Sequence, residues 1–222
     1  MKKNSIHILI VTSVALCAGA TLPFLFGHST IDPEQQSVKS EVPYCVTSPS
    51  VPDKITFAGQ EIDLTRYDHR ERMDREQMSF TYMHSTTMLT IKRANRFFPI
   101  IEPILKENGV PDDFKSLAVI ESNLNTLARS PAGAAGMWQF MQTTGREFGL
   151  EVNPNIDERY HVEKATRAAC KYLKDAYQRY GNWLCVAAAY NGGQGRISSE
   201  LKKQLVDQAV DLWLVEETSR YM

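Results

Sequence analysis

The sequence predicts a mainly α-helical domain with little or no sheet, preceded by an export segment and a linker. Its 222 residues are 43% hydrophobic and 23% charged, which is the composition of one ordinary globular domain with attachments. From Ile55 onward the apolar residues recur chiefly at helical spacing, and only a short stretch around Ile55, Phe57, Ile62 and Leu64 alternates as strands do. Disorder throughout the chain is excluded.

Charge and metal-ligand content exclude several classes of function. The chain has 25 Lys and Arg against 26 Asp and Glu, and no run of basic residues is longer than two, so no nucleic-acid partner is predicted. Its four cysteines and five histidines show none of the spacings typical of zinc or iron-sulfur sites. We therefore predict neither a metal nor a cofactor.

Residues 1–28 have the pattern of an export signal. Lys2 and Lys3 precede a mostly apolar stretch, Ile6 to Phe26, and no acidic residue is present. The small residues Ala18-Gly19-Ala20 form a cleavage site, which predicts a signal peptide that is removed. The apolar stretch is 21 residues long and could span a bilayer, so an uncleaved membrane anchor is the alternative. Both predict an exported protein.

Residues 29–53 have the composition of a linker. Pro33, Pro43, Pro49 and Pro52 stand among Ser, Glu, Gln and Lys, and such a segment cannot bury much surface. The linker is expected to space the following domain from the membrane.

Six helices are expected after the linker, in an N-terminal helical extension (54–108) and a further domain (109–222). Asp68 and Asp112 are expected N-caps, while Gly109-Val110-Pro111, Gly149 and Gly181 mark helix ends. The expected helices lie near residues 68–86, 88–108, 112–122, 138–149, 161–180 and 182–190.

The cysteines leave alternatives open. Cys17 lies in the export segment, where lipid attachment is a lesser alternative, and Cys45 lies in the linker. Cys170 and Cys185 could form a disulfide across two expected helices in an oxidising compartment. Both stand among apolar residues, however, so we favour the alternative that they are small core residues.

Glu121 stands at the end of an apolar helical stripe. Phe114, Leu117, Ala118 and Glu121 fall at i, i+3, i+4 and i+7, so they share one helix face. Burial and the negative end of the helix both disfavour an ionised carboxylate, so the pKa of Glu121 is expected to be raised, which suits a general acid near neutral pH. The alternative is that the helix frays after Ile120 and leaves Glu121 solvated.

The segment from Ser122 to Arg146 contains no Asp or Glu and is predicted to be a loop that returns to a helix. Glycines allow a backbone to approach a ligand closely, and Met137-Trp138-Gln139 offers apolar and amide surface, a combination suited to N-acetylated sugars. The alternative is a tight turn in which Met137 and Trp138 belong to the core.

A third element is the helix of small residues that ends in Tyr190-Asn191-Gly192-Gly193. Tyr190 could donate its hydroxyl into a cleft, and the alternative is a buried tyrosine at a glycine-capped helix end. A phosphate-binding loop is discounted, because no strand precedes these glycines and no Gly-Lys-Ser/Thr follows them.

Taken together, these elements resemble the lytic transglycosylases of the soluble-lytic-transglycosylase type, and among them the branch of membrane-bound lytic murein transglycosylase D. The resemblance covers roughly residues 55 to 222. Each motif alone is weak, but their common order and spacing make the set specific. The motifs are Glu121-Ser122, Ser130-Pro131-x-Gly133-Ala134-Ala135-Gly136-Met137-Trp138-Gln139, Ala189-Tyr190-Asn191-Gly192-Gly193-x-Gly195-Arg196 and Glu217-Thr218-x-x-Tyr221.

The resemblance implies a lysozyme-like, goose-lysozyme or transglycosylase type of fold in which residues 109–222 form the catalytic domain. It also implies a monomer of the bacterial envelope, in the periplasm, whose partner is the glycan strand of peptidoglycan. Glu121 would be the catalytic acid and then base. The implied substrate-binding residues are Ser122, Ser130, Gly136, Met137, Gln139, Met141, Tyr190, Asn191, Glu217 and Tyr221.

The implied reaction cleaves the bond between N-acetylmuramic acid and N-acetylglucosamine and closes a 1,6-anhydro ring, in cell-wall turnover. Two competing functions remain. A goose-type lysozyme would hydrolyse the same bond, and a catalytically silent envelope protein would only bind peptidoglycan.

Overall fold

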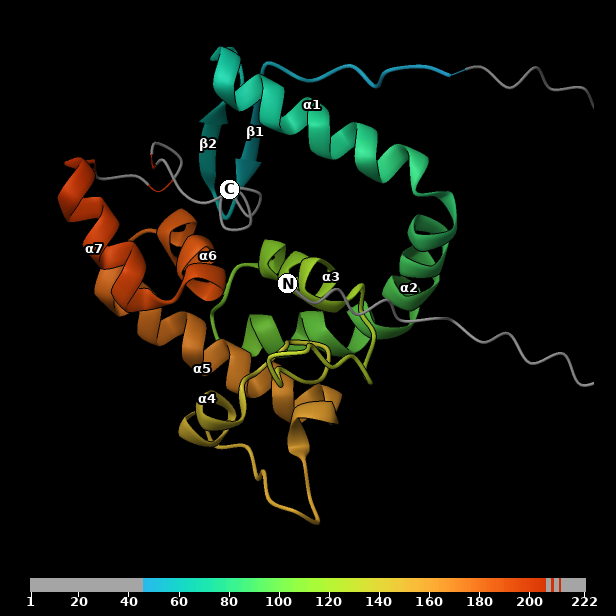
Figure 1. Ribbon diagram of the computed structural model, residues 1–222, viewed down its shortest axis with the longest axis vertical. Coiled ribbons are helices and arrows are strands. Elements are labelled where there is room, and N and C mark those ends of the chain that lie inside the picture. The colour runs from blue at the N-terminus through green and yellow to red at the C-terminus, as the bar shows by residue number, and fades with distance from the viewer. Residues whose placement is uncertain (1–45, 207–208, 210–211, 213–222) are drawn as a thin grey trace, which may run out of the picture. The chain divides into compact units, whose positions relative to one another are not determined.

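The computed structural model describes residues 46–206, 209 and 212 (Figure 1). The predicted export segment (1–28) and most of the predicted linker lie outside the described residues. In chain order the elements are β1 (Lys54–Phe57), β2 (Gln60–Asp63), α1 (Tyr67–Tyr82), α2 (His84–Glu107), η1 (Asp112–Phe114), α3 (Lys115–Ser122), α4 (Gln142–Glu147), η2 (Glu158–Tyr160), α5 (Val162–Tyr180), α6 (Trp183–Gly192) and α7 (Gln194–Gln204). The mainly helical fold class is confirmed.

The sheet is one antiparallel hairpin, formed by the alternating stretch that the sequence singled out. β1 pairs with β2 in a register that joins Lys54 to Asp63 and Phe57 to Gln60. Ala58 and Gly59 form the two-residue turn with φ values of 50° and 77°, as a tight hairpin turn of the primed type requires. The hairpin touches the helical core through Phe57, whose ring lies 5.3 Å from that of Phe114.

Helix α5 occupies the centre of the core. Its buried face carries Ala165, Ala169, Leu173 and Ala176, at the spacing of one helical stripe. α2 and α6 both pack on α5, and α6 also packs on α7, as Figure 1 shows. The small alanine side chains allow these helices to approach closely.

The C-terminal half of α2 belongs to the same core. Ile101 and Leu105 of α2 are completely buried in the cluster that also contains the apolar face of α5. The boundary expected between the helical extension and the following domain, at residues 108 and 109, therefore does not separate two cores. It coincides with the end of α2, where Gly109 has a φ of 68°.

One helix prediction is wrong, and one helix was not predicted. Of the helix expected over 138–149, only Gln142–Glu147 is helical. The residues before it are not helical because Gln139 has a left-handed backbone with a φ of 49° and the carbonyls of Met137 and Trp138 accept hydrogen bonds from side chains of other helices. The helix expected near 182–190 is α6, which ends at Gly192, but no helix was expected over residues 194–204, where α7 lies with Ile197 buried.

The helix-end predictions are partly correct. Gly181 caps α5 with a φ of 61°, as expected. Neither expected aspartate is an N-cap, because α1 begins after Arg66, with Asp68 inside its first turn, and Asp112 is the first residue of η1.

Neither Cys170 nor Cys185 forms a disulfide and both are buried, so the alternative of a disulfide between them is wrong and the core-residue alternative is confirmed. Burial raises the pKa of the Cys170 thiol to about 11. Cys17 and Cys45 lie outside the described residues.

The described end of the predicted linker, residues 46–53, contains no helix or strand and is tied to α1. The Tyr82 hydroxyl donates to the Thr47 carbonyl at 2.5 Å and accepts the Thr47 N–H at 2.8 Å. Arg70 reaches the Val51 carbonyl at 3.1 Å. Among the helices that the structure describes, none combines the length and the apolar character needed to cross a bilayer.

Candidate active site

Helix α3 carries Glu121 in its last turn. Phe114, Leu117 and Ala118 are buried beneath the helix, as the apolar stripe predicts. Glu121 is half-buried at the end of that stripe. Apolar burial therefore fixes the helix that presents the carboxylate.

The end of α3 is well formed. Asn123 takes the left-handed conformation with a φ of 50°, and its N–H donates to the Val119 carbonyl at 2.7 Å. Arg93 of α2 donates to the Asn123 carbonyl at 3.0 Å. Because the helix continues through Ser122, the alternative in which it frays after Ile120 is wrong.

Ser122 joins α3 to the following loop. Its hydroxyl oxygen lies 2.8 Å from the Met137 carbonyl oxygen and 3.1 Å from the Ala118 carbonyl oxygen. The hydroxyl therefore contacts two backbone carbonyls, and it holds the end of the helix against the middle of the loop.

The middle of the loop is part of the core. Met137 is 1% exposed and Trp138 is fully buried, with its indole N–H donating to the Thr166 hydroxyl at 2.9 Å. Of the two alternatives, the tight turn with core Met and Trp is therefore correct. The Met137 side chain faces the core, so the predicted contact of Met137 with a sugar stays a prediction that only its backbone could meet.

Gly136 is required by two features of the backbone. Its φ is 78°, and a Cβ at this position would lie only 1.8 Å from the Arg159 carbonyl oxygen. Its role in the loop is therefore a close approach of two backbone segments, a role that glycine alone fills.

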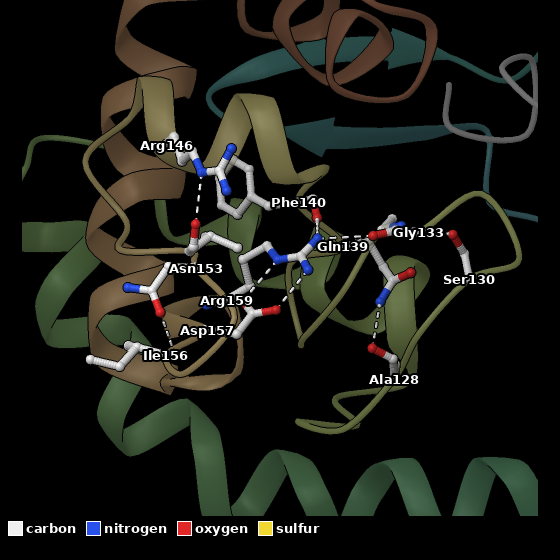
Figure 2. A network of polar contacts seen from close by, with 12 residues as sticks. Ala128, Ser130, Gly133, Gln139, Phe140, Arg146, Asn153, Ile156, Asp157 and Arg159 are labelled. Carbon is white, nitrogen blue, oxygen red and sulfur yellow. Dashed lines mark hydrogen bonds and ion pairs between the residues drawn. The ribbon is translucent and has the colours of Figure 1, made fainter.

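Ser130, Gln139 and Met141 lie at the edges of the loop. The Ser130 hydroxyl accepts the Ala134 N–H at 3.0 Å. The Gln139 side-chain amide donates to the Gly136 carbonyl at 2.7 Å and to the Ala128 carbonyl at 3.3 Å, and Figure 2 shows this second contact. Met141 is 43% exposed, so its side chain is accessible to a ligand.

Tyr190 reaches the same loop from α6. Its hydroxyl donates to the Trp138 carbonyl at 2.8 Å, and its ring lies between 5.2 and 6.5 Å from those of Trp138, Phe140 and Tyr172. Tyr190 is half-buried, as is Asn191 in the last turn of α6. The tyrosine therefore combines packing with a specific hydrogen bond to the loop.

The Glu121-Ser122 motif and the Tyr190 motif are far apart in the sequence, but both contact the loop motif, at the neighbouring carbonyls of Met137 and Trp138. Ser122, next to Glu121, binds the carbonyl of Met137, and Tyr190 binds the carbonyl of Trp138. Glu217 and Tyr221, the fourth motif, lie outside the described residues.

Sequence reasoning missed Arg159 and Asp157, which hold the other side of the loop (Figure 2). Arg159 is 5% exposed, and its guanidinium forms an ion pair with Asp157 at 2.7 Å. The hydrogen bond from Arg159 lowers the pKa of Asp157, and the carboxylate in turn raises the pKa of Arg159. The polar run Asp157-Glu158-Arg159 resembles an exposed turn, and no pattern in the sequence signals its burial.

Within the described part of the chain, no three His, Cys, Asp or Glu side chains lie together as metal ligands would. Several polar groups of the loop, among them the carbonyls of Gly133, Met137 and Trp138, have side-chain partners in the same domain. What the arrangement offers chemically is the Glu121 carboxylate at the end of a rigid helix.

Comparison with known proteins adds the family. A family model described as the transglycosylase SLT domain matches residues 98–209. Membrane-bound lytic murein transglycosylase D of Escherichia coli (strain K12) is 30% identical over 178 residues, which make up 77% of this chain and 38% of that protein. Membrane-bound lytic murein transglycosylase F of Shewanella frigidimarina is 29% identical over 121 residues, 50% of this chain and 24% of that protein.

A peptidoglycan transglycosylase of Escherichia phage T7 is 37% identical over 95 residues, 41% of this chain and 7% of the phage protein. The chain therefore spans well under half the length of each of these relatives. The family match covers half of the chain and includes Glu121, the loop and Tyr190. The chain belongs to the transglycosylase SLT domain family.

Proposed function

We propose that this protein is a peptidoglycan lytic transglycosylase that cleaves the β-1,4 bond between N-acetylmuramic acid and N-acetylglucosamine. The observation that carries the proposal is the convergence of Glu121-Ser122, the 130–141 loop and Tyr190 on the carbonyls of Met137 and Trp138. The family match and the names of the relatives, which are murein or peptidoglycan transglycosylases, support the substrate class.

In the proposed mechanism Glu121 acts twice. Its carboxylic acid first gives a proton to the glycosidic oxygen, and the bond between that oxygen and the anomeric carbon breaks. The carboxylate then takes the proton of the muramoyl 6-hydroxyl, whose oxygen bonds to the anomeric carbon. The product is a 1,6-anhydro sugar, Glu121 regains its proton, and no water is consumed.

The absence of a neighbouring carboxylate in the sequence supports this route. Most glycosidases use two carboxylates, one as acid and one as nucleophile or base. No Asp or Glu occurs between Glu121 and Glu147, so the loop that packs on α3 offers no second one. A hydroxyl of the bound substrate can replace it, because an intramolecular nucleophile has an effective molarity of about 10⁵ M or more.

We further propose that Ser130, Gln139, Met141, Tyr190 and Asn191 line the sugar subsites, with Ser122 and Gly136 shaping them through the backbone. Glu217 and Tyr221 remain proposed members of the same site. The proposed setting is the bacterial periplasm, where a monomer acts in cell-wall turnover after export, or while attached to the membrane by residues 1–28.

Digestion of purified sacculi by the full-length chain, followed by mass analysis of the released sugars, tests the proposal. The expected products are anhydro-muropeptides, which are one water lighter than hydrolysed fragments. Products with reducing ends would assign the protein to goose-type lysozyme chemistry. Binding to sacculi without release of sugars would assign it to a silent peptidoglycan-binding protein, and both outcomes would overturn the proposal.

A further inference from the structure

Arg159 carries a buried charge that takes no part in the proton transfers of the proposed reaction. Its side chain is 5% exposed, and an unpaired guanidinium there would be costly. Asp157 neutralises it through two parallel hydrogen bonds, from Nε to Oδ1 at 2.9 Å and from Nη2 to Oδ2 at 2.7 Å. This paired geometry needs a planar guanidinium, and a lysine ammonium cannot reproduce it.

The remaining nitrogen of the guanidinium, Nη1, binds the loop at two points. It donates to the Gly133 carbonyl at 2.9 Å and to the Phe140 carbonyl at 3.0 Å, as Figure 2 shows. The Phe140 carbonyl also accepts the Ala135 N–H at 3.0 Å. One nitrogen of Arg159 therefore joins the two arms of the 133–140 loop.

The backbone of Arg159 touches the same loop. A Cβ added to Gly136 would fall 1.8 Å from the Arg159 carbonyl oxygen, so the two backbones are in direct contact. Arg159 thus contacts the loop through its side chain at both arms and through its backbone in between.

The contacts of Arg159 bracket those of the candidate active site. Met137 and Trp138, whose carbonyls bind Ser122 and Tyr190, lie between Gly133 and Phe140 in the sequence. Arg159 fixes the ends of the loop, and Ser122 and Tyr190 hold its middle. A shift of the loop would therefore move the groups that meet at residues 137 and 138.

We propose that Arg159 is a positioning residue for the reaction: its guanidinium, paired with Asp157, sets the 133–140 loop against the end of α3 and thereby the placement of Glu121 relative to the glycan. This inference rests on the proposed function and deepens it. The Arg159 side chain is 5% exposed and its guanidinium is engaged by Asp157 and two loop carbonyls, so we expect its effect to fall on the geometry of the bound complex and not on substrate affinity.

The test compares Arg159→Lys with the unaltered full-length chain on purified glycan strands. The variant keeps the positive charge but loses the planar fork. We expect kcat to fall about tenfold or more, because misplacement of reacting groups by about 1 Å costs up to about 10²-fold. KM is expected to change by less than about threefold. Rates are referred to folded enzyme, measured by circular dichroism at the assay temperature.

Asp157→Asn is the second variant, and it tests the effect of the Arg159–Asp157 pair on kcat if Arg159→Lys does not fold. It leaves the contacts of Nη1 with Gly133 and Phe140 but removes the carboxylate that orients the guanidinium, so we expect a smaller fall in kcat, about threefold or more.

Arg146→Lys is the matched control, because Arg146 also donates to a backbone carbonyl, that of Val152 at 2.7 Å, but does not bind the loop. Its kcat is expected to be that of the unaltered chain.

If Arg159→Lys and Asp157→Asn both kept the kcat of the unaltered chain per folded molecule, Arg159 and Asp157 would serve stability alone, and the inference would be overturned. A loss that appears only in KM would also overturn it. These outcomes differ from failure of the proposed function, in which the unaltered chain itself releases no anhydro product.

Discussion

The helix α3 and the loop over residues 130–141 build the candidate site together, but they are stabilised in different ways. α3 rests on apolar burial, with Phe114, Leu117 and Ala118 packed in the core. The loop also buries four apolar residues, Ala135, Met137, Trp138 and Phe140, but hydrogen bonds to its carbonyl groups hold its path in addition.

This difference determines how each region tolerates change. A helix on a broad apolar face loses stability in proportion to the surface removed. A loop with left-handed residues and close backbone contacts depends on a few positions that have no substitute. The loop is therefore expected to be the more sensitive of the two regions, in both stability and activity.

Gly136→Ala should have the largest effect on stability. The added Cβ would lie 1.8 Å from the Arg159 carbonyl oxygen at a residue with a φ of 78°, so the two backbone segments must separate. We expect a loss of about 4 kcal/mol or more in the free energy of unfolding, measured by urea denaturation.

Gly133→Ala is the control for this experiment. Gly133 also has a positive φ, 93°, but a Cβ added there would meet nothing within 4 Å. Only backbone strain applies, and the expected cost is about 1 kcal/mol. Equal losses in the two variants would show that close packing against Arg159 does not stabilise the loop.

Leu117→Ala probes the helix. Leu117 is 3% exposed, so truncation leaves a cavity and should lower the free energy of unfolding by about 3 kcal/mol. Ile120, on the same helix, is 52% exposed, and Ile120→Ala is expected to cost less than about 1 kcal/mol. Thermal unfolding of both variants measures the contrast, and similar losses would mean that the apolar face of α3 is not what holds it.

Tyr190→Phe should have the smallest effect on stability of the three. It removes the hydrogen bond to the Trp138 carbonyl, which costs about 1 kcal/mol, but turnover is expected to fall about tenfold because the loop is released from α6. Tyr180→Phe is the matched control, since the Tyr180 hydroxyl donates to the Gln194 carbonyl at 2.6 Å, away from the loop. An unchanged rate for Tyr190→Phe would reduce Tyr190 to a packing role.

The parts of the fold that depend on periodicity could be predicted from the sequence. The stripe Phe114, Leu117, Ala118 predicted α3 and the place of Glu121 on it, because one buried face leaves a 3.6-residue pattern. The alternation around Ile55 and Ile62 similarly marked the one hairpin of the described residues.

The loop could not be predicted in the same way. Its left-handed residue Gln139 and the contact between Gly136 and Arg159 depend on segments about twenty residues apart, and no local pattern encodes them. The expected helix from residue 138 was wrong for this reason. The intrinsic helix propensities of Trp138 and Gln139 do not prevent a helix. The Trp138 carbonyl, however, accepts a hydrogen bond from the Tyr190 hydroxyl of α6.

Buried polar residues were the other omission. Arg159 carries a charge that composition alone places at the surface, and only the structure reveals that Asp157 and two carbonyls satisfy it. α7 was missed because the glycines before it suggested an end to helical structure, although Ile197 anchors a further helix.

The central claim is that Glu121 supplies the proton for bond cleavage, and Glu121→Gln tests it most directly. The matched control is Glu107→Gln at the last turn of α2, where the carboxylate forms an exposed ion pair with Arg167 at 2.8 Å. We expect Glu121→Gln to release soluble muropeptides from sacculi at least about 10³-fold more slowly than Glu107→Gln, with both variants folded by circular dichroism. Release by folded Glu121→Gln at a rate near that of the control would contradict the account, because another group would then have to be the acid.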